Sequence, residues 1–111
     1  MNIKSLTRVE EVILLAVFQL GADAYGVKIR ARVEEMTGKS FSVGAIYIPL
    51  DRLAKHKLLE TEIGDPIPER GGRRKRYYKL NKSGLAALRE AKRLHDAIWA
   101  GVPELEGKAS S

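Results

Sequence analysis

Residues 69–79 read Glu69-Arg-Gly-Gly-Arg-Arg-Lys-Arg-Tyr-Tyr-Lys79. Six of the ten residues from 70 to 79 are basic and none is acidic, so this segment matches the formal net charge of the whole chain, +6. Glycines and prolines between residues 64 and 72 predict a turn between two β-like runs, at 58–63 and 75–80. A basic β-hairpin of this kind suits a phosphate backbone or a narrow groove. A hairpin charged only for solubility would carry mixed signs.

Two helical patterns open the chain. Thr7 and Glu10 have the spacing of a capping box, and apolar residues at helical spacing continue to Gly21, where this helix is expected to end. Asp23 is placed to cap a second helix, which Gly38 would end. Each helix therefore has a start signal and a stop signal of its own.

A third helix is expected to begin after Ser42, across the short connection typical of a helix-turn-helix. Pro49 falls inside this helix and removes a backbone donor, so either the helix bends there or it begins later. Lys57 stands where a glycine would end the helix with less strain. The expected apolar face carries Val43, Ile46, Leu50 and Leu53, and the opposite face carries Ala45, Ile48, Arg52 and Lys55.

The last helical pattern, capped by Asn81 and running from about Lys82 to Ala100, is apolar around much of its circumference. A helix of this kind needs two partners, its own domain and a second chain. The pattern predicts a two-fold dimer through this helix and the first helix. The candidate residues of this interface are Leu15, Phe18, His95, Ile98 and Trp99.

The order of elements predicts a mainly α fold with a small β-hairpin (α+β), a winged helix-turn-helix followed by a C-terminal dimerisation helix. Residues 1–80 are expected to form the DNA-binding domain, 81–100 the dimerisation helix and 101–111 a flexible tail. In this arrangement the third helix enters the major groove of double-stranded DNA, and the hairpin reaches the backbone or the minor groove.

Each expected DNA contact has its own chemistry. Small residues at the start of the third helix let backbone N–H groups approach a phosphate. The Tyr47 hydroxyl can hydrogen-bond a phosphate. The guanidinium group of Arg52 can donate two hydrogen bonds to the edge of a guanine base. The arginines of the hairpin are expected to supply most of the salt-dependent affinity. The candidate DNA-binding residues are Ser42, Gly44, Ala45, Tyr47, Ile48, Arg52, Lys55, Arg70, Gly71, Gly72, Arg73, Arg74, Lys75 and Arg76.

Composition argues against several other classes of protein. The chain has 111 residues, enough for one domain, and no cysteine, which excludes disulfides and cysteine-based zinc sites. His56 and His95 are its only histidines and neither has a nucleophile beside it, so we expect no catalytic residue, no metal and no cofactor. The apolar run 12–20 is too short for a bilayer, which takes about 20 residues, so the chain is expected to be cytoplasmic with no membrane contact.

Three motifs together resemble the PadR family of bacterial transcriptional regulators. They are Ala24-Tyr-Gly-Val-Lys-Ile29, then Val43-Gly-Ala-Ile-Tyr47 with Leu50-Asp-Arg-Leu53, then Pro68-Glu-Arg-Gly-Gly-Arg73 leading to Arg76-Tyr-Tyr-Lys-Leu80. The resemblance implies a homodimer that binds an inverted repeat in a promoter, usually as a repressor released by a small effector or a stress signal.

The resemblance also implies roles for single residues. Tyr47 corresponds to the recognition-helix tyrosine near the DNA backbone, and Gly71 and Gly72 to the tip of the wing. In some members a cavity at the dimer interface accepts flat aromatic or cationic effectors, and Trp99 would line it here, unless it only fills the dimer core. Ile48-Pro49 and Lys57 depart from the usual pattern. The alternative function is a winged helix that binds nucleic acid or protein without promoter specificity.

Overall fold

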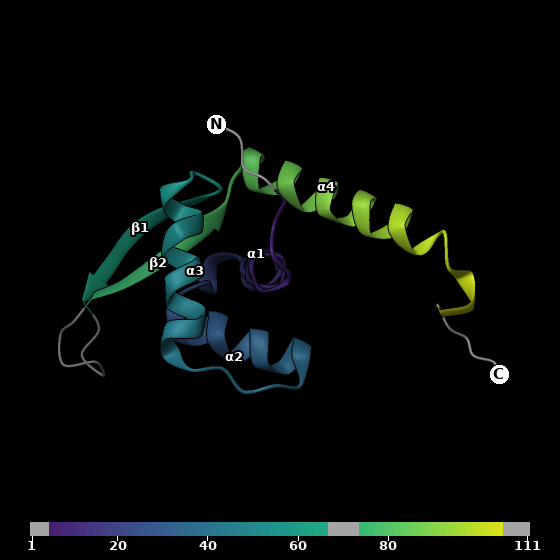
Figure 1. Cartoon of the computed structure of the whole chain (residues 1–111). Coiled ribbons are helices and arrows are strands. Elements are labelled where there is room, and N and C mark those ends of the chain that lie inside the picture. Colours follow the sequence, from purple (N-terminus) through teal and green to yellow (C-terminus); the bar gives the residue numbers. More distant parts are fainter. Residues whose placement is uncertain (1–4, 67–73, 106–111) are drawn as a thin grey trace.

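The computed structural model describes residues 5–66 and 74–105 of the chain. Four α-helices and one antiparallel hairpin form in these residues, which confirms the predicted mainly α fold with a small hairpin (Figure 1). The predicted wing-tip residues Arg70, Gly71, Gly72 and Arg73 lie outside the described residues. The elements are α1 (Arg8–Leu20), η1 (Gly21–Asp23), α2 (Gly26–Thr37), α3 (Val43–Lys55), β1 (Leu59–Pro66), β2 (Arg74–Leu80), α4 (Lys82–Trp99) and η3 (Pro103–Leu105).

Side-chain caps start three of the helices as the sequence predicts. At α1 the Glu10 N–H donates to the Thr7 hydroxyl at 3.1 Å and the Thr7 N–H donates to Glu10 Oε1 at 2.9 Å, a complete capping box. Ser42 Oγ accepts the N–H of Ala45 at the start of α3. Asn81 Oδ1 accepts the N–H of Gly84 at the start of α4. Each cap satisfies a backbone donor that a helix leaves without an internal partner.

The prediction that Asp23 caps α2 is wrong. Asp23 closes the short helix η1, and α2 begins only after Tyr25, which makes no side-chain cap. The reason is a long-range pairing. Tyr25 forms an antiparallel bridge with Tyr77, and the Tyr78 N–H donates to the Ala24 carbonyl at 2.8 Å. Both contacts need extended backbone at residues where a cap at Asp23 would already require a helix.

α3 begins at the predicted residue and continues through Pro49, so a later start is excluded. Ile46, Leu50 and Leu53 are buried as expected, but Val43 is 56% exposed. Placing Val43 in the core was therefore wrong: residues 43–45 at the start of α3 are all exposed, and burial begins only at Ile46. Lys57 has φ 65°, the left-handed conformation expected where glycine would be less strained.

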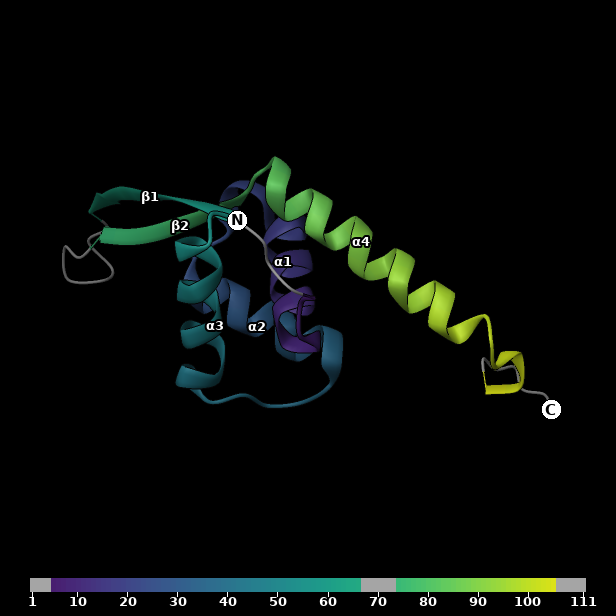
Figure 2. The same cartoon turned by 45° about the horizontal axis from the view of Figure 1, so that its top comes forward.

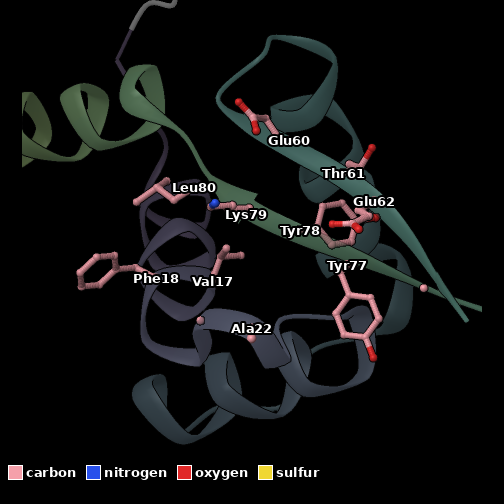
Figure 3. Close-up of a pocket in the computed structure, with 12 residues that line it drawn as sticks. Val17, Phe18, Ala22, Glu60, Thr61, Glu62, Tyr77, Tyr78, Lys79 and Leu80 are labelled. Carbon is pink, nitrogen blue, oxygen red and sulfur yellow. The ribbon is translucent and has the colours of Figure 1, made fainter.

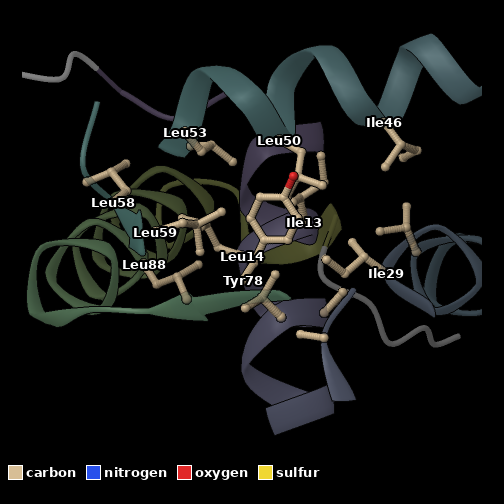
Figure 4. Packing of buried hydrophobic residues seen from close by; sticks show 14 residues of the cluster. Ile13, Leu14, Ile29, Ile46, Leu50, Leu53, Leu58, Leu59, Tyr78 and Leu88 are labelled. Atoms are coloured by element: carbon tan, nitrogen blue, oxygen red, sulfur yellow. The ribbon is translucent and has the colours of Figure 1, made fainter. Parts of the chain in front are cut away.

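One hydrophobic core joins the four α-helices and both strands, with the far end of α4 outside it (Figure 4). Tyr78 is the tyrosine of the wing that faces this core, whereas Tyr77 packs against Tyr25 with ring centroids 5.6 Å apart. The wing is thereby fixed to the start of α2 and to the core. The core side chains are Ile13, Leu14, Ala16, Val17, Ala24, Ile29, Val33, Ile46, Leu50, Leu53, Leu58, Leu59, Tyr78 and Leu88.

The hairpin and α4 extend in opposite directions from this core, as Figures 1 and 2 both show. Within α4 only Gly84 and Leu88 are buried, and both lie in its first half. None of the helices in the described part of the chain combines the length and the apolar character needed to cross a bilayer.

Candidate nucleic-acid interface

The two faces of the hairpin differ in charge. Side chains alternate along a strand, so Arg74, Arg76 and Tyr78 share one face of β2. Arg76 and Tyr78 line a groove of about 880 Å³ beside α3. The hairpin therefore presents arginine on the side where the third helix lies.

The other face of the hairpin carries carboxylates. Glu60 and Glu62 of β1 stand opposite Lys79 and Tyr77 of β2. With the end of α1 they line an open hollow of about 730 Å³ (Figure 3). Lys79 also lines the hollow, so Glu60 and Glu62 leave it with an excess of one negative charge. A DNA backbone is therefore expected on the arginine-bearing α3 side of the hairpin and not in this hollow.

A small cavity of about 110 Å³ lies where the hairpin meets the start of α2. The Tyr47 ring lies directly over Gly26. A methyl group added at Gly26 would come 2.1 Å from Tyr47 Oη, which shows how closely the ring approaches the glycine. Lys75 Nζ lies 3.8 Å from the centroid of the Tyr25 ring. The residues that line the cavity are Tyr25, Gly26, Val27, Tyr47, Arg74, Lys75, Arg76 and Tyr78.

The groups around this cavity are hydrogen-bond donors and positive charges, which suit a phosphate. The first N–H groups of a helix have no internal partner, and no side chain caps those of α2. The helix dipole adds partial positive charge at the same end. The Tyr47 hydroxyl and two arginines of β2 add donors beside it. Tyr25 and Gly26 were not among the predicted site residues, because their role depends on contacts with residues distant in the sequence.

Arg76 also affects Tyr78 within the core. Burial raises the pKa of the Tyr78 hydroxyl above its usual value, and the guanidinium of Arg76 opposes this shift through a hydrogen bond and its charge. The ring of Tyr78 is thus buried in the core, while the neighbouring Arg76 lines the groove beside α3.

Four of the exposed residues of α3 form one stripe along the helix: Gly44, Ile48, Asp51 and Lys55. Their spacing of four, three and four places them on one side of the helix, away from the buried side chains. The Asp51 carboxylate lies 3.9 Å from Lys55 Nζ. Asp51 was not predicted as a site residue, although helical spacing alone would have placed it on this stripe.

Arg52 has a partner within the chain. Its Nε lies 3.2 Å from Glu10 Oε2, and Glu10 also caps α1 through its other oxygen. The Glu10 side chain is only 12% exposed, so water screens this pair less than it would screen a surface pair. Reading of guanine by Arg52 stays a prediction, and it would require the guanidinium to leave Glu10 or to bridge both groups.

The candidate dimer and effector residues fall on separate surfaces of the single chain. Leu15 packs beside the core, and Phe18, 64% exposed, lines the hollow beside the hairpin. His95, Ile98 and Trp99 line a groove of about 360 Å³ between α4 and the first turn of α1 with the residues just before it. Contact between the two sets therefore requires a second chain. Among the described residues, no group of three or more histidine, cysteine, aspartate or glutamate side chains is placed to hold a metal.

Several solved structures share this fold. A PadR-like transcriptional regulator from Bacillus cereus is 27% identical over 90% of this chain and 93% of its own, with a TM-score of 0.70. A PadR family regulator from Clostridium difficile is 22% identical over 91% of this chain and all of its own, with a TM-score of 0.70. A PadR-like transcription factor from Bacteroides fragilis is 24% identical over 87% and 88% of the two chains, with a TM-score of 0.70. No curated protein matches the chain.

The model of one sequence family, the transcriptional regulator PadR-like family, matches residues 14–90. The matched region includes α2, α3 and the wing, which are the elements of the candidate interface, and it covers more than half of the chain. This is a family of transcriptional regulators and not of enzymes, in agreement with the sequence prediction. By fold and by sequence, the chain belongs to the PadR-like family of transcriptional regulators.

Proposed function

We propose that this regulator binds an inverted repeat in a promoter as a homodimer and represses transcription there. The observation that carries the proposal is the grouping of three DNA-binding features on one side of the domain. The exposed stripe of α3, the Tyr47 hydroxyl over the start of α2, and the arginines of β2 lie around two adjoining cavities. A helix in the major groove and a basic wing on the neighbouring backbone use all three features at once.

A dimer is supported by the exposed apolar side chains of α4. Leu94 is 38% and Ile98 61% exposed, and both line the groove that includes Trp99. The far half of this helix also extends away from the core of its own chain (Figure 2). A two-fold dimer that binds an inverted repeat needs its two copies of α3 about 34 Å apart, which is one turn of DNA.

Sedimentation at micromolar concentration tests the dimer. The wild-type chain is expected to sediment as a dimer and the variant Ile98→Glu as a monomer, because a buried carboxylate at the interface is costly. The control variant Lys82→Glu lies on the same helix but outside the groove, and it should leave the dimer intact. A wild-type chain that is only monomeric contradicts the proposal.

Release of the repressor by a small aromatic or cationic effector is the second part of the proposal. Support comes from the groove at Trp99, where the His95 ring lies 5.6 Å from the indole ring. Because Trp99 is the only tryptophan, its fluorescence reports on this groove alone. We expect planar aromatic compounds to quench it, and no quenching by any of them would remove the effector from the proposal.

Duplex binding measured against salt and competitor tests promoter specificity. A specific regulator should prefer its operator by about 10³-fold or more over random DNA. Arg74→Ala and Arg76→Ala should each reduce the slope of log affinity against log salt by about 0.9. Arg89→Ala removes the same charge from exposed α4 and should leave the slope unchanged. Equal affinity for any polyanion would instead favour a winged helix without promoter specificity.

A further inference from the structure

The outward side chains in the first half of α3 lack hydrogen-bonding groups. Gly44, Ala45 and Ile48 are exposed, and none of them donates to or accepts from a base. The Ser42 hydroxyl is held at the helix end, where it accepts the Ala45 N–H at 3.1 Å. The Tyr47 hydroxyl is held over Gly26, at the start of α2.

Ile48 is the one large apolar side chain at the centre of this face. It is 65% exposed, whereas Ile46 on the same helix is fully buried, so packing within the chain does not account for Ile48. Its neighbour one turn earlier is Gly44, where an added methyl group would lie 3.8 Å from Ile48 Cδ1. Because Gly44 has no side chain, Ile48 projects further from this part of the helix than its neighbour does. In a DNA major groove, the methyl groups of Ile48 would therefore contact the base edges first.

The major groove offers one apolar group for such a side chain. Base edges there present hydrogen-bond donors and acceptors, and thymine alone adds the C5-methyl group. Apolar contact with this methyl is therefore the sequence-dependent contact that Ile48 is able to make. Asp51 and Lys55, one and two turns further along the stripe, carry the polar groups of the same face.

We propose that Ile48 contacts thymine methyl groups, so that each half of the operator carries thymine under the first half of α3. This inference rests on the proposed function, because it needs α3 in the major groove of a preferred sequence. Burial of one methyl group corresponds to about a fourfold change in affinity. One or two such contacts per half-site would give a measurable preference for thymine.

The test removes the methyl groups from the DNA and leaves the protein unchanged. A duplex selected by the wild-type protein from a random pool is resynthesised with uracil in place of thymine, one position at a time. Uracil at one or two positions per half-site should weaken wild-type binding about fourfold each. Ile48→Ala should bind the thymine and uracil duplexes equally.

Lys55→Ala is the matched control on the same face of α3. It should weaken binding to thymine and uracil duplexes by the same factor, because it removes a charge and no methyl contact. Uracil that is harmless at every position, or a thymine preference that survives in Ile48→Ala, overturns the inference while promoter specificity stands. Failure to select any preferred duplex overturns both the inference and the proposed function.

Discussion

Replacement of Gly26 by alanine is expected to weaken operator binding by about ten- to a hundredfold while the fold is kept. The added methyl group would lie 2.1 Å from Tyr47 Oη and 2.5 Å from Tyr47 Cζ, closer than side-chain carbon atoms approach in proteins. The Tyr47 ring must therefore turn away from the start of α2. A hydrogen bond from its hydroxyl to a phosphate contributes about 1.5–3 kcal/mol, which gives the expected loss of affinity.

The effect on stability should be smaller. Overpacking of a core costs about 1–3 kcal/mol, but Tyr47 is only partly buried and has solvent on one side, so a value near 1 kcal/mol is expected. Urea unfolding measures this term, and fluorescence anisotropy of a labelled operator measures binding. Gly101→Ala is the matched control, because the nearest atom to its added methyl group is the Ile98 carbonyl oxygen, at 3.6 Å.

A double-mutant cycle separates the role of Tyr47 from other effects of the alanine. In a Tyr47→Ala background the change at Gly26 should have little further effect on binding. The reasoning is refuted if Gly26→Ala binds the operator as tightly as the wild-type protein. It is also refuted if the full loss persists when the Tyr47 ring is absent.

Three further predictions concern stability. Gly84→Ala should lower the free energy of unfolding by about 3 kcal/mol in urea, because its methyl group would lie 2.3 Å from the Leu58 carbonyl oxygen, and backbone does not yield easily. Lys57→Gly should raise it by up to about 1 kcal/mol by relieving the left-handed conformation, whereas Lys57→Ala should not. Because the pKa of Tyr78 is raised, its contribution to stability is complete below pH 10 and is lost as pH rises through the raised value. Absorbance at 295 nm should show one of the four tyrosines ionising late, and Tyr78→Phe should remove that late step.

Local interactions account for the parts of the fold that the sequence predicts well. The capping residues Thr7, Ser42 and Asn81 act within three residues of their partners, so sequence spacing is enough to place them. The prediction that Asp23 caps α2 fails because the start of α2 depends on pairing between Tyr25 and Tyr77, which lie far apart in the chain. Local propensity favours a helix cap at a place where tertiary pairing requires extended backbone.

The candidate site shows the same division. The basic residues of the wing are predicted from the charge of the sequence, and Tyr47 is predicted from the family motif. The ion pair between Arg52 and Glu10 joins residues 42 positions apart, and no local pattern predicts it. The small cavity at Gly26 likewise depends on how the Tyr47 ring packs against another helix. Sequence reasoning thus names most of the polar groups, whereas the structure gives their mutual positions.

Glu10 serves two tasks with one carboxylate. Oε1 accepts the Thr7 N–H that begins α1, and Oε2 accepts from Arg52 on the helix proposed to enter the groove. If α3 reads the operator as proposed, a change at this position is expected to alter chain stability and operator preference together. A substitution at residue 10 would leave Arg52 without its partner and favour a matching substitution at residue 52. The two positions are therefore expected to vary as a pair among relatives that keep this architecture.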